Sequence, residues 1–400
     1  MRWWTGKRDR VETRSALMSL SDPALAEWFG VGIRNDAGVA VNEHSSLGLS
    51  SFWRANNLVA GTIGTLPMHT YRTLDDGSRE RVGSFLDNPG GPDGLTPFEW
   101  KETVITHAFV HGNAFLAHQY NQAGGLIGLV PVHPLAVEVK RDADTIGGRL
   151  YTVTLEDGRR RTFSMLDMTH IPSLSLDGLR GLSMIGIARN SLGTSIAGDK
   201  AAARHFGSGM LVSGLVTPEE DMTEAEAGTV KTSLTAKLSG TENAGDIAVI
   251  NRRLKFTQWS QAAKDAQFLE SRQFQVEEVA RWTGVPPHLL MQTEKQTSWG
   301  TGVAEQNRGL ARFTLAPWTS RLEQRLSRLL ARPRFVEFEF AGLEKPTPEE
   351  EIRLLIEQVD AGLLTPNEAR RIRNLPPIDG GDTARARPVS SPSPTGELTA

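Results

Sequence analysis

The 400-residue sequence contains no cysteine. This absence excludes disulfide bonds, thiolate catalysis, and zinc or iron–sulfur sites built on cysteine. Long apolar runs are also missing, because Pro131, His133 and Pro134 interrupt the longest one, residues 126–139, which is too short to span a bilayer. The charged N-terminus lacks the continuous apolar segment of a secretory signal. We therefore expect the protein in the cytoplasm, or in a particle assembled there.

Short enzyme motifs are absent as well. The sequence has no phosphate-binding loop of the form GxxxxGK[ST], no GxGxxG after a predicted strand, no GxSxG and no HExxH. The formal net charge of −3 argues against a strongly basic nucleic-acid binder, although a local basic patch stays compatible with it. Charged residues make up 23% and apolar residues 39%, as in folded proteins. The length predicts two or three domains.

Periodicity and turn residues predict a mixed α+β chain. Residues 1–40 form a basic, aromatic arm, for which we expect a mobile terminus with local docking. Thr96, Pro97 and Glu99 together have the pattern of a capping box at a helix start. Helices are expected at 42–60, 96–111, 184–206, 223–240, 261–283, 303–330 and 347–361, with a short one after Thr365. Strands are expected at 68–72, 114–120, 128–131, 136–141, 150–155, 162–164 and 335–340.

A small strand–helix–strand unit is predicted at residues 210–260. Thr223 and Glu226 open its helix as a capping box. Strands are expected at 210–216, 246–250 and 254–258. The helix before the unit is rich in Gly, Ala and Ser, and such small residues let helices approach closely. The unit is therefore interpreted as an insertion at the end of a helical hairpin. Pro317 is expected to kink or split the later helix at 303–330.

Histidines give the best case for an enzyme. His107 and His111 lie four residues apart on one predicted helix, a spacing that can hold a metal. No carboxylate or third histidine follows on that face, so ordinary helix histidines are favoured. His133, His170 and His205 have no partner that the sequence identifies and are interpreted as structural. The sequence therefore predicts no metal, no cofactor and no catalytic residue.

Five stretches in this order resemble the phage portal proteins of the HK97-like family. Each stretch alone is weak evidence for the family, but the order and spacing of the five over residues 40–385 are specific to it. The first is Gly112-Asn-Ala-Phe-Leu-Ala-His118 with Leu129-Val-Pro-Val-His-Pro134; the others are Asp167-Met-Thr-His-Ile171, Asp177-Gly-Leu-Arg-Gly-Leu-Ser-Met184, Asp265–Arg272 through Val279-Ala to Gly284-Val-Pro-Pro287, and Leu364-Thr-Pro-Asn-Glu-Ala-Arg370 with Leu375-Pro-Pro and Gly380-Gly-Asp382.

The resemblance implies a ring-forming portal fold at one capsid vertex, around a DNA channel. It implies an α/β wing, a helical stem, a small α/β clip, a tunnel loop and a helical crown. After the arm at 1–40, the parts would be the wing at 41–183 and 303–340, the stem at 184–206 and 261–284, the clip at 207–260, the tunnel loop at 285–302, the crown at 341–385 and a disordered tail at 386–400.

The resemblance also implies partners and sites, and no enzymatic activity. The expected assembly is a dodecamer within the virion that contacts the terminase large subunit, the major capsid protein, head–tail connector or adaptor proteins, and double-stranded DNA, but no membrane. The tunnel-loop residues expected nearest the DNA are Gln292, Glu294, Lys295, Gln296 and Trp299. The clip residues expected to dock the motor or connector are Glu219, Glu220, Asp221, Arg252 and Arg253.

Two other classes of protein remain open at this point. One is a cytoplasmic soluble α/β enzyme with a histidine-based site, for which His107 and His111 are the best support. The other is a cytoplasmic scaffold of helical repeats, although no fixed repeat period appears in the sequence. The size of the oligomer separates these classes, because an enzyme would usually be a dimer or tetramer and a portal a large closed ring.

Overall fold

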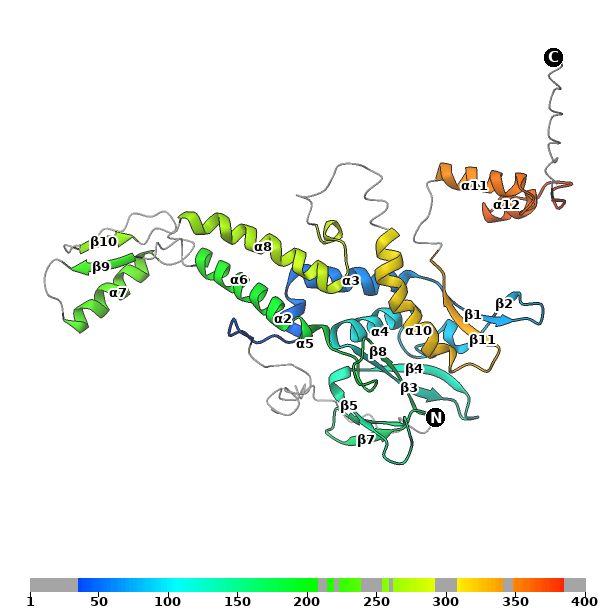
Figure 1. Cartoon of the computed structure of the whole chain (residues 1–400), viewed down its shortest axis with the longest axis horizontal. Coiled ribbons are helices and arrows are strands. Elements are labelled where there is room, and N and C mark those ends of the chain that lie inside the picture. The colour runs from blue at the N-terminus through cyan, green and yellow to red at the C-terminus, as the bar shows by residue number, and fades with distance from the viewer. Residues whose placement is uncertain are drawn as a thin grey trace, which may run out of the picture. The chain divides into compact units, whose positions relative to one another are not determined.

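The computed structural model describes residues 35–207, 214–218, 223–238, 254–258, 262–291, 308–340 and 348–384. The chain divides into two units at Phe340. Figure 1 shows the elements of both units with their labels. Within the described residues, no helix is both long and apolar enough to cross a membrane.

Two helices open the first unit where the sequence predicted one. Helix α2 spans Glu43–Leu47 and α3 spans Ser50–Thr65. The single helix expected over residues 42–60, with its end near Gly61, was therefore wrong, because α3 continues to Thr65 and packs on the helix α4 (Pro97–His111). A Cβ added to Gly64 would lie 2.8 Å from the Phe98 ring. Gly64 therefore permits a close helix contact instead of ending the helix.

Helix α4 spans Pro97–His111 and confirms the predicted capping box. The Thr96 hydroxyl accepts from the backbone N–H of Glu99, and the Glu99 carboxylate accepts from the Thr96 N–H. Trp100, on the first turn, is fully buried and donates a 2.7 Å hydrogen bond to the carbonyl of Leu129. The helix ends at Gly112, which has a left-handed φ of 72°. The chain then turns directly into strand β3.

Three antiparallel sheets of three strands each belong to the first unit. Their strand orders are β11-β1-β2, β4-β3-β8 and β5-β6-β7. The strands are β1 Met68–Thr73, β2 Arg79–Val82, β3 Asn113–Tyr120, β4 Leu126–Val132, β5 Val137–Arg141, β6 Arg149–Thr154, β7 Arg160–Phe163, β8 Met168–Pro172 and β11 Arg334–Phe338. Short 3-10 turns lie at Phe85–Asp87 (η1) and Pro134–Ala136 (η2).

The second and third sheets share one apolar core. Its buried side chains are Phe115, Val137, Val139, Tyr151, Val153 and Met168. The imidazole of His170 on β8 stacks on Phe115 with 4.5 Å between ring centroids. Strands β2 and β8 were not predicted from the sequence. The first is short and polar, and the second is recognisable only through its pairing with β3.

Helices α6 (Arg189–Gly207) and α8 (Ala262–Thr283) lie side by side in antiparallel orientation. A short helix, α5 (Met184–Ile187), precedes α6. Asp199 and Arg272 form a 2.7 Å ion pair across the two long helices. A Cβ on Gly198 would meet the Gln275 side chain at 3.5 Å. The small-residue helix thus packs against a neighbour, as expected, although the contact at Gly198 is an ordinary one.

Strand β9 (Gly214–Pro218), helix α7 (Glu224–Leu238) and strand β10 (Leu254–Gln258) lie between α6 and α8 in the chain. The strands β9 and β10 pair with each other antiparallel. The Glu226 carboxylate accepts from both the N–H and the hydroxyl of Thr223, as the predicted cap requires. The strand expected at 246–250 lies outside the described residues.

The helix predicted around Pro317 is interrupted as expected. A π-helical segment (η5, Leu310–Leu315) is followed by α10 (Ala316–Ser327), and Pro317 occupies the first turn of α10. Proline has no N–H for the preceding turn, and a π-helical register accommodates that loss. After α8, Gly284 takes a φ of 70° and a 3-10 turn (η4, Pro287–Leu290) follows.

The second unit contains helices α11 (Pro348–Asp360) and α12 (Pro366–Ile372). The capping box predicted for the short helix is present between Thr365 and Glu368. Asn367, in the first turn of α12, is buried and holds the following loop. Its side chain accepts from the N–H of Ile378 and donates to the Ile378 carbonyl and to the Asp382 carboxylate.

Candidate functional site

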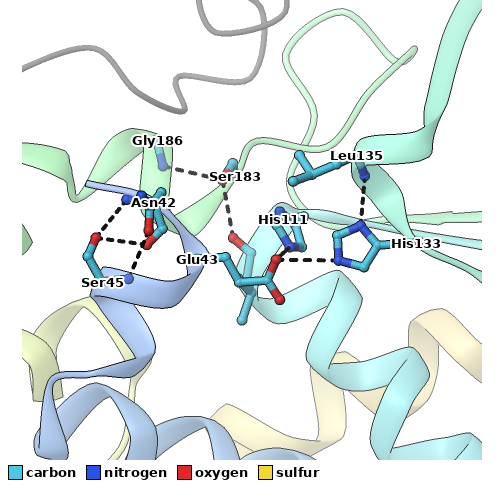
Figure 2. Close-up of polar contacts among 9 residues, drawn as sticks. Asn42, Glu43, Ser45, His111, His133, Leu135, Ser183 and Gly186 are labelled. Carbon is cyan, nitrogen blue, oxygen red and sulfur yellow. Dashed lines mark hydrogen bonds and ion pairs between the residues drawn. The ribbon is translucent and has the colours of Figure 1, made fainter. Parts of the chain in front are cut away.

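Four titratable side chains from three separate segments meet beside the C-terminal end of α4. They are Glu43, His107, His111 and His133. Figure 2 shows Glu43, His111 and His133 pointing toward one another. The separation of these residues along the chain explains why the sequence did not reveal the cluster. In particular, the interpretation of His133 as a residue without a partner was wrong.

Glu43 is positioned by the cap of α2. The side chain of Asn42 accepts from the N–H of Ser45 at 2.8 Å, and the Ser45 hydroxyl accepts from the N–H of Asn42 at 2.9 Å. This reciprocal pair fixes the first turn of a five-residue helix. Glu43 is the first residue of that helix, so its carboxylate leaves the turn at a defined angle.

One carboxylate oxygen of Glu43 contacts two imidazoles. Glu43 Oε2 lies 3.2 Å from His111 Nε2 and 3.3 Å from His133 Nε2. The contact with His111 first, and that with His133 second, hold the pKa of Glu43 well below its usual range. Glu43 is therefore a carboxylate over the whole physiological pH range.

The histidines have different environments. The side chain of His111 is only 4% exposed, whereas those of His133 and Glu43 are 45% and 35% exposed. The rings of both His107 and His111 meet the His133 ring edge-on, each with 5.3 Å between centroids. Burial, followed by the neighbouring His133 and His111, lowers the pKa of His107 to about 3. His107 is thus a neutral packing residue at neutral pH.

The predicted tunnel-loop and clip residues stay predictions. Gln292, Glu294, Lys295, Gln296 and Trp299 lie outside the described residues, and so do Glu219, Glu220, Asp221, Arg252 and Arg253. Of the other histidines, His170 is structural as expected, because its Nε2 bonds to Asn113 Oδ1 at 2.9 Å. The His205 side chain lies outside the described residues.

A second buried polar group lies next to the cluster along the chain. The side-chain amide of Asn113 donates to the carbonyls of His111 and Gly181, and its oxygen accepts from the Gly181 N–H. Together with the bond to His170, it joins β3, β8 and the loop before α5. These contacts fix the backbone of the joined segments and use both N–H donors of the Asn113 side chain. Asn113 therefore has a structural role and offers no reactive atom.

The fold defines a class of protein in which a helical hairpin with a small insertion is joined to an α/β body. It combines a mixed α/β body with an antiparallel pair of long helices, and the segment between those helices carries a small strand–helix–strand unit. The comparisons with known proteins agree with this architecture.

The chain belongs to the phage portal protein family, whose model matches residues 50–374. It is 30% identical over 387 residues to the "Probable portal protein" of Streptomyces phage phiC31, with 90% of this chain and 81% of that protein covered. It is 29% identical over 358 residues to the portal protein of Enterobacteria phage HK97, with 86% and 83% covered.

Solved structures give the same fold. An HK97-family phage portal protein from Corynebacterium diphtheriae superposes with a TM-score of 0.59 at 17% identity, covering 78% of this chain and all of that one. The neck of a native gene transfer agent particle, computed with C12 symmetry, superposes with a TM-score of 0.57 at 22% identity, covering 90% and 100%. The resemblance stated from the sequence is thereby confirmed, and the enzyme alternative finds no support among these relatives.

Proposed function

We propose that this protein forms a dodecameric ring at one vertex of a phage capsid and provides the channel for packaging and ejecting the genome. Membership of the portal family supports this, and one structural relative is the neck of a gene transfer agent particle computed with C12 symmetry. In this role the chain catalyses nothing, and the terminase large subunit supplies the ATP-driven motor. Assembly takes place in the host cytoplasm, and the ring then stays in the virion.

The observation that carries the proposal is the set of exposed aromatic side chains on and around the long helices. Phe274 and Trp282 on α8 are 53% and 39% exposed, and Phe313 in the π-helical segment is 75% exposed. Large apolar groups cost free energy when left in water. Contacts between neighbouring subunits of a ring would bury them, which a single chain does not.

The parts of the proposed ring follow the expected division of the chain. The wing comprises 41–183 and 303–340, the stem 184–206 and 261–284, and the clip 207–260. The tunnel loop is 285–302 and the crown 341–385. The antiparallel contact of α6 with α8 supports the stem assignment, since the segment proposed as the clip connects these helices.

The test of the ring is light scattering on purified protein, with negative-stain images. A particle of about a dozen subunits with a central hole supports the proposal, whereas a compact dimer or tetramer contradicts it. If the purified protein is a monomer, the same measurement is made after co-expression with the major capsid protein. A monomer under that condition also contradicts the proposal. Phe274→Asp and Phe313→Asp should break the ring. Ile146→Asp, at a fully exposed hairpin tip, is the matched control and should leave it intact.

The tunnel loop is proposed to contact passing DNA through Gln292, Glu294, Lys295, Gln296 and Trp299. The loop is polar and lies between two helices in the chain. Each phosphate that a basic side chain neutralises adds affinity, and the ring repeats every contact, so a channel needs few such residues. Alanine at Lys295 and Trp299 should impair packaging or DNA retention. Unchanged packaging and retention would remove the loop from the proposal.

The clip is proposed to bind the terminase during filling and head–tail connector proteins afterwards. The candidate residues are Glu219, Glu220 and Asp221 on one side and Arg252 and Arg253 on the other. Complementary charge across an interface speeds association and selects partners. Reversal of the three acidic charges should weaken terminase binding in a pull-down from purified components. Equal binding by the reversed variant would reject this docking surface.

A further inference from the structure

We propose that Glu43, His111 and His133 form a binding site for one divalent transition-metal ion, with Zn²⁺ as the best fit. Their ligand atoms, one carboxylate oxygen and two imidazole nitrogens, all lie within 4.8 Å of one another. No other such group of three occurs in the part of the chain that the structure describes. The inference concerns a site that the ring and channel do not require.

The distances match a tetrahedral ion. Zinc–nitrogen and zinc–oxygen bonds of about 2.0–2.2 Å place two ligands of a tetrahedron roughly 3.3 Å apart. Glu43 Oε2 lies 3.2 Å from His111 Nε2 and 3.3 Å from His133 Nε2. Two edges of the tetrahedron are therefore already formed. The third edge, between the two histidine nitrogens, is at most 4.8 Å long, and a shift of the partly exposed His133 ring can adjust it.

The buried nitrogen of His111 is the second observation that points to a ligand. Its Nε2 is enclosed and, among the described residues, has no hydrogen-bond partner of acceptable geometry. The 3.2 Å contact with Glu43 has the length of an ion pair without the alignment of a hydrogen bond. A buried polar atom left in this state costs free energy. A metal ion about 2.0–2.2 Å from both the nitrogen and the carboxylate oxygen, set to one side of the line that joins them, would satisfy it.

The donor set selects the class of metal. Two imidazoles and a carboxylate suit zinc, cobalt and nickel, whereas magnesium and calcium prefer oxygen ligands throughout. Glu43 and His133 are partly exposed, so an ion can enter from solvent and keep a water molecule as its fourth ligand. His107 stays out of the ligand set, since its nitrogens are not among the atoms that cluster within 4.8 Å.

Coordination through Nε2 of His133 requires a tautomer change in that ring. The Nδ1 of His133 accepts a long, 3.3 Å hydrogen bond from the N–H of Leu135. A neutral His133 in this state carries its proton on Nε2, facing Glu43. Coordination through Nε2 moves that proton to Nδ1 and gives up the bond from Leu135. The bond is long and solvent-exposed, so its loss is small beside three metal–ligand bonds.

A bound ion would join three segments that are distant in the sequence. Glu43 begins α2, His111 ends α4, and His133 lies between β4 and η2. Any ligand that binds only the folded state stabilises that state. Zinc should therefore raise the thermal unfolding midpoint of the protein.

The test uses full-length protein without a histidine tag, stripped of metal with EDTA and then dialysed against Zn²⁺. The expected result is one zinc per chain by elemental analysis, which excess Mg²⁺ does not displace. Co²⁺ in place of zinc should give the strong visible absorption of a four-coordinate site. Glu43→Gln and His133→Ala should each weaken binding by at least about 100-fold, beyond what changes around a ligand set usually cost.

His69→Ala is the matched control. His69 Nε2 lies 3.4 Å from Glu339 Oε2, which is the same type of contact with only one histidine. This variant should bind zinc like the original chain. Absence of stoichiometric zinc binding by the original chain would overturn the proposal, whether or not the variants fold. Undiminished zinc binding by folded Glu43→Gln and His133→Ala would overturn it as well.

Discussion

The side-chain oxygen of Asn113 lies 2.9 Å from Nε2 of His170, on the neighbouring strand. The same oxygen accepts a 2.8 Å bond from the N–H of Gly181, while the amide nitrogen donates to the carbonyls of His111 and Gly181. The two carbonyl acceptors fix which end of the amide is oxygen, so His170 must be the donor to it. Three of the stretches that resemble portal proteins meet at this one side chain.

Asn113→Ala should lower the free energy of unfolding by about 2–4 kcal/mol. The substitution leaves the Gly181 N–H and the His170 ring N–H without partners inside the protein, and each buried unpaired group costs about 1–3 kcal/mol. Urea denaturation followed by circular dichroism measures the change. Asn121→Ala is the control, because Asn121 makes a comparable turn contact to Gly125 at an exposed site. A loss at Asn113 no larger than at Asn121 would contradict the prediction.

Gly112→Ala should cost more than about 3 kcal/mol, or prevent folding. Gly112 has a φ of 72°, and a Cβ there would lie 2.1 Å from the carbonyl oxygen of Leu182. Gly124 has a similar φ of 79° but no atom within 4 Å of the added Cβ. Gly124→Ala should therefore show the backbone cost alone, about 1 kcal/mol. Equal losses in thermal unfolding would mean that the contact with Leu182 adds nothing.

Lys101 should make the stability rise with pH above neutrality. Its ammonium is buried and donates a 2.5 Å hydrogen bond to the carbonyl of Leu66 at the end of α3. Burial lowers the pKa of Lys101 from its usual value near 10.4 to about 8. Between these two values the unfolded chain binds more protons than the folded one, so the free energy of unfolding increases as the pH rises. The increase from this residue is up to about 3 kcal/mol.

The measurement is urea denaturation of the original chain and of Lys101→Met at about pH 7.5 and about pH 10. The difference in unfolding free energy between the two proteins should shift in favour of the original chain at the higher pH. Lys140→Met is the control, because Lys140 is exposed and pairs with Glu138 on the surface. If the difference in unfolding free energy between the original chain and Lys101→Met stays constant with pH, Lys101 remains charged throughout, and the prediction is contradicted.

Asn367→Ala should loosen the second unit without unfolding the first. Asn367 holds Ile378 through two hydrogen bonds and Asp382 through a third. Hydrogen exchange followed by mass spectrometry should show faster exchange in residues 366–382 only, because local opening is measured segment by segment. Arg371→Ala, at an exposed position of the same helix, should leave the exchange unchanged. Faster exchange throughout the first unit would contradict the independence of the two units.

Local signals in the sequence predicted helix starts well. The capping boxes at Thr96 and Thr365 need only four neighbouring residues, and both formed. Long-range contacts explain the errors. Helix α3 continued past Gly61 because Phe98 packs against it, and β8 was missed because its pairing with β3 defines it. The cluster of Glu43 with His111 and His133 joins three segments with no shared motif, so no pattern in the sequence could have revealed it.

Strand β1 is synthesised long before β11, with which it pairs. Met68 lies opposite Phe338, about 270 residues further along the chain. A ribosome adds about 5–20 residues per second, so β1 waits between roughly 13 and 54 seconds before its partner on that edge exists. During that interval only β2 can pair with β1, and one of its edges stays available to strands of other nascent chains. We therefore expect copies of the unfinished chain to pair with one another first at this edge.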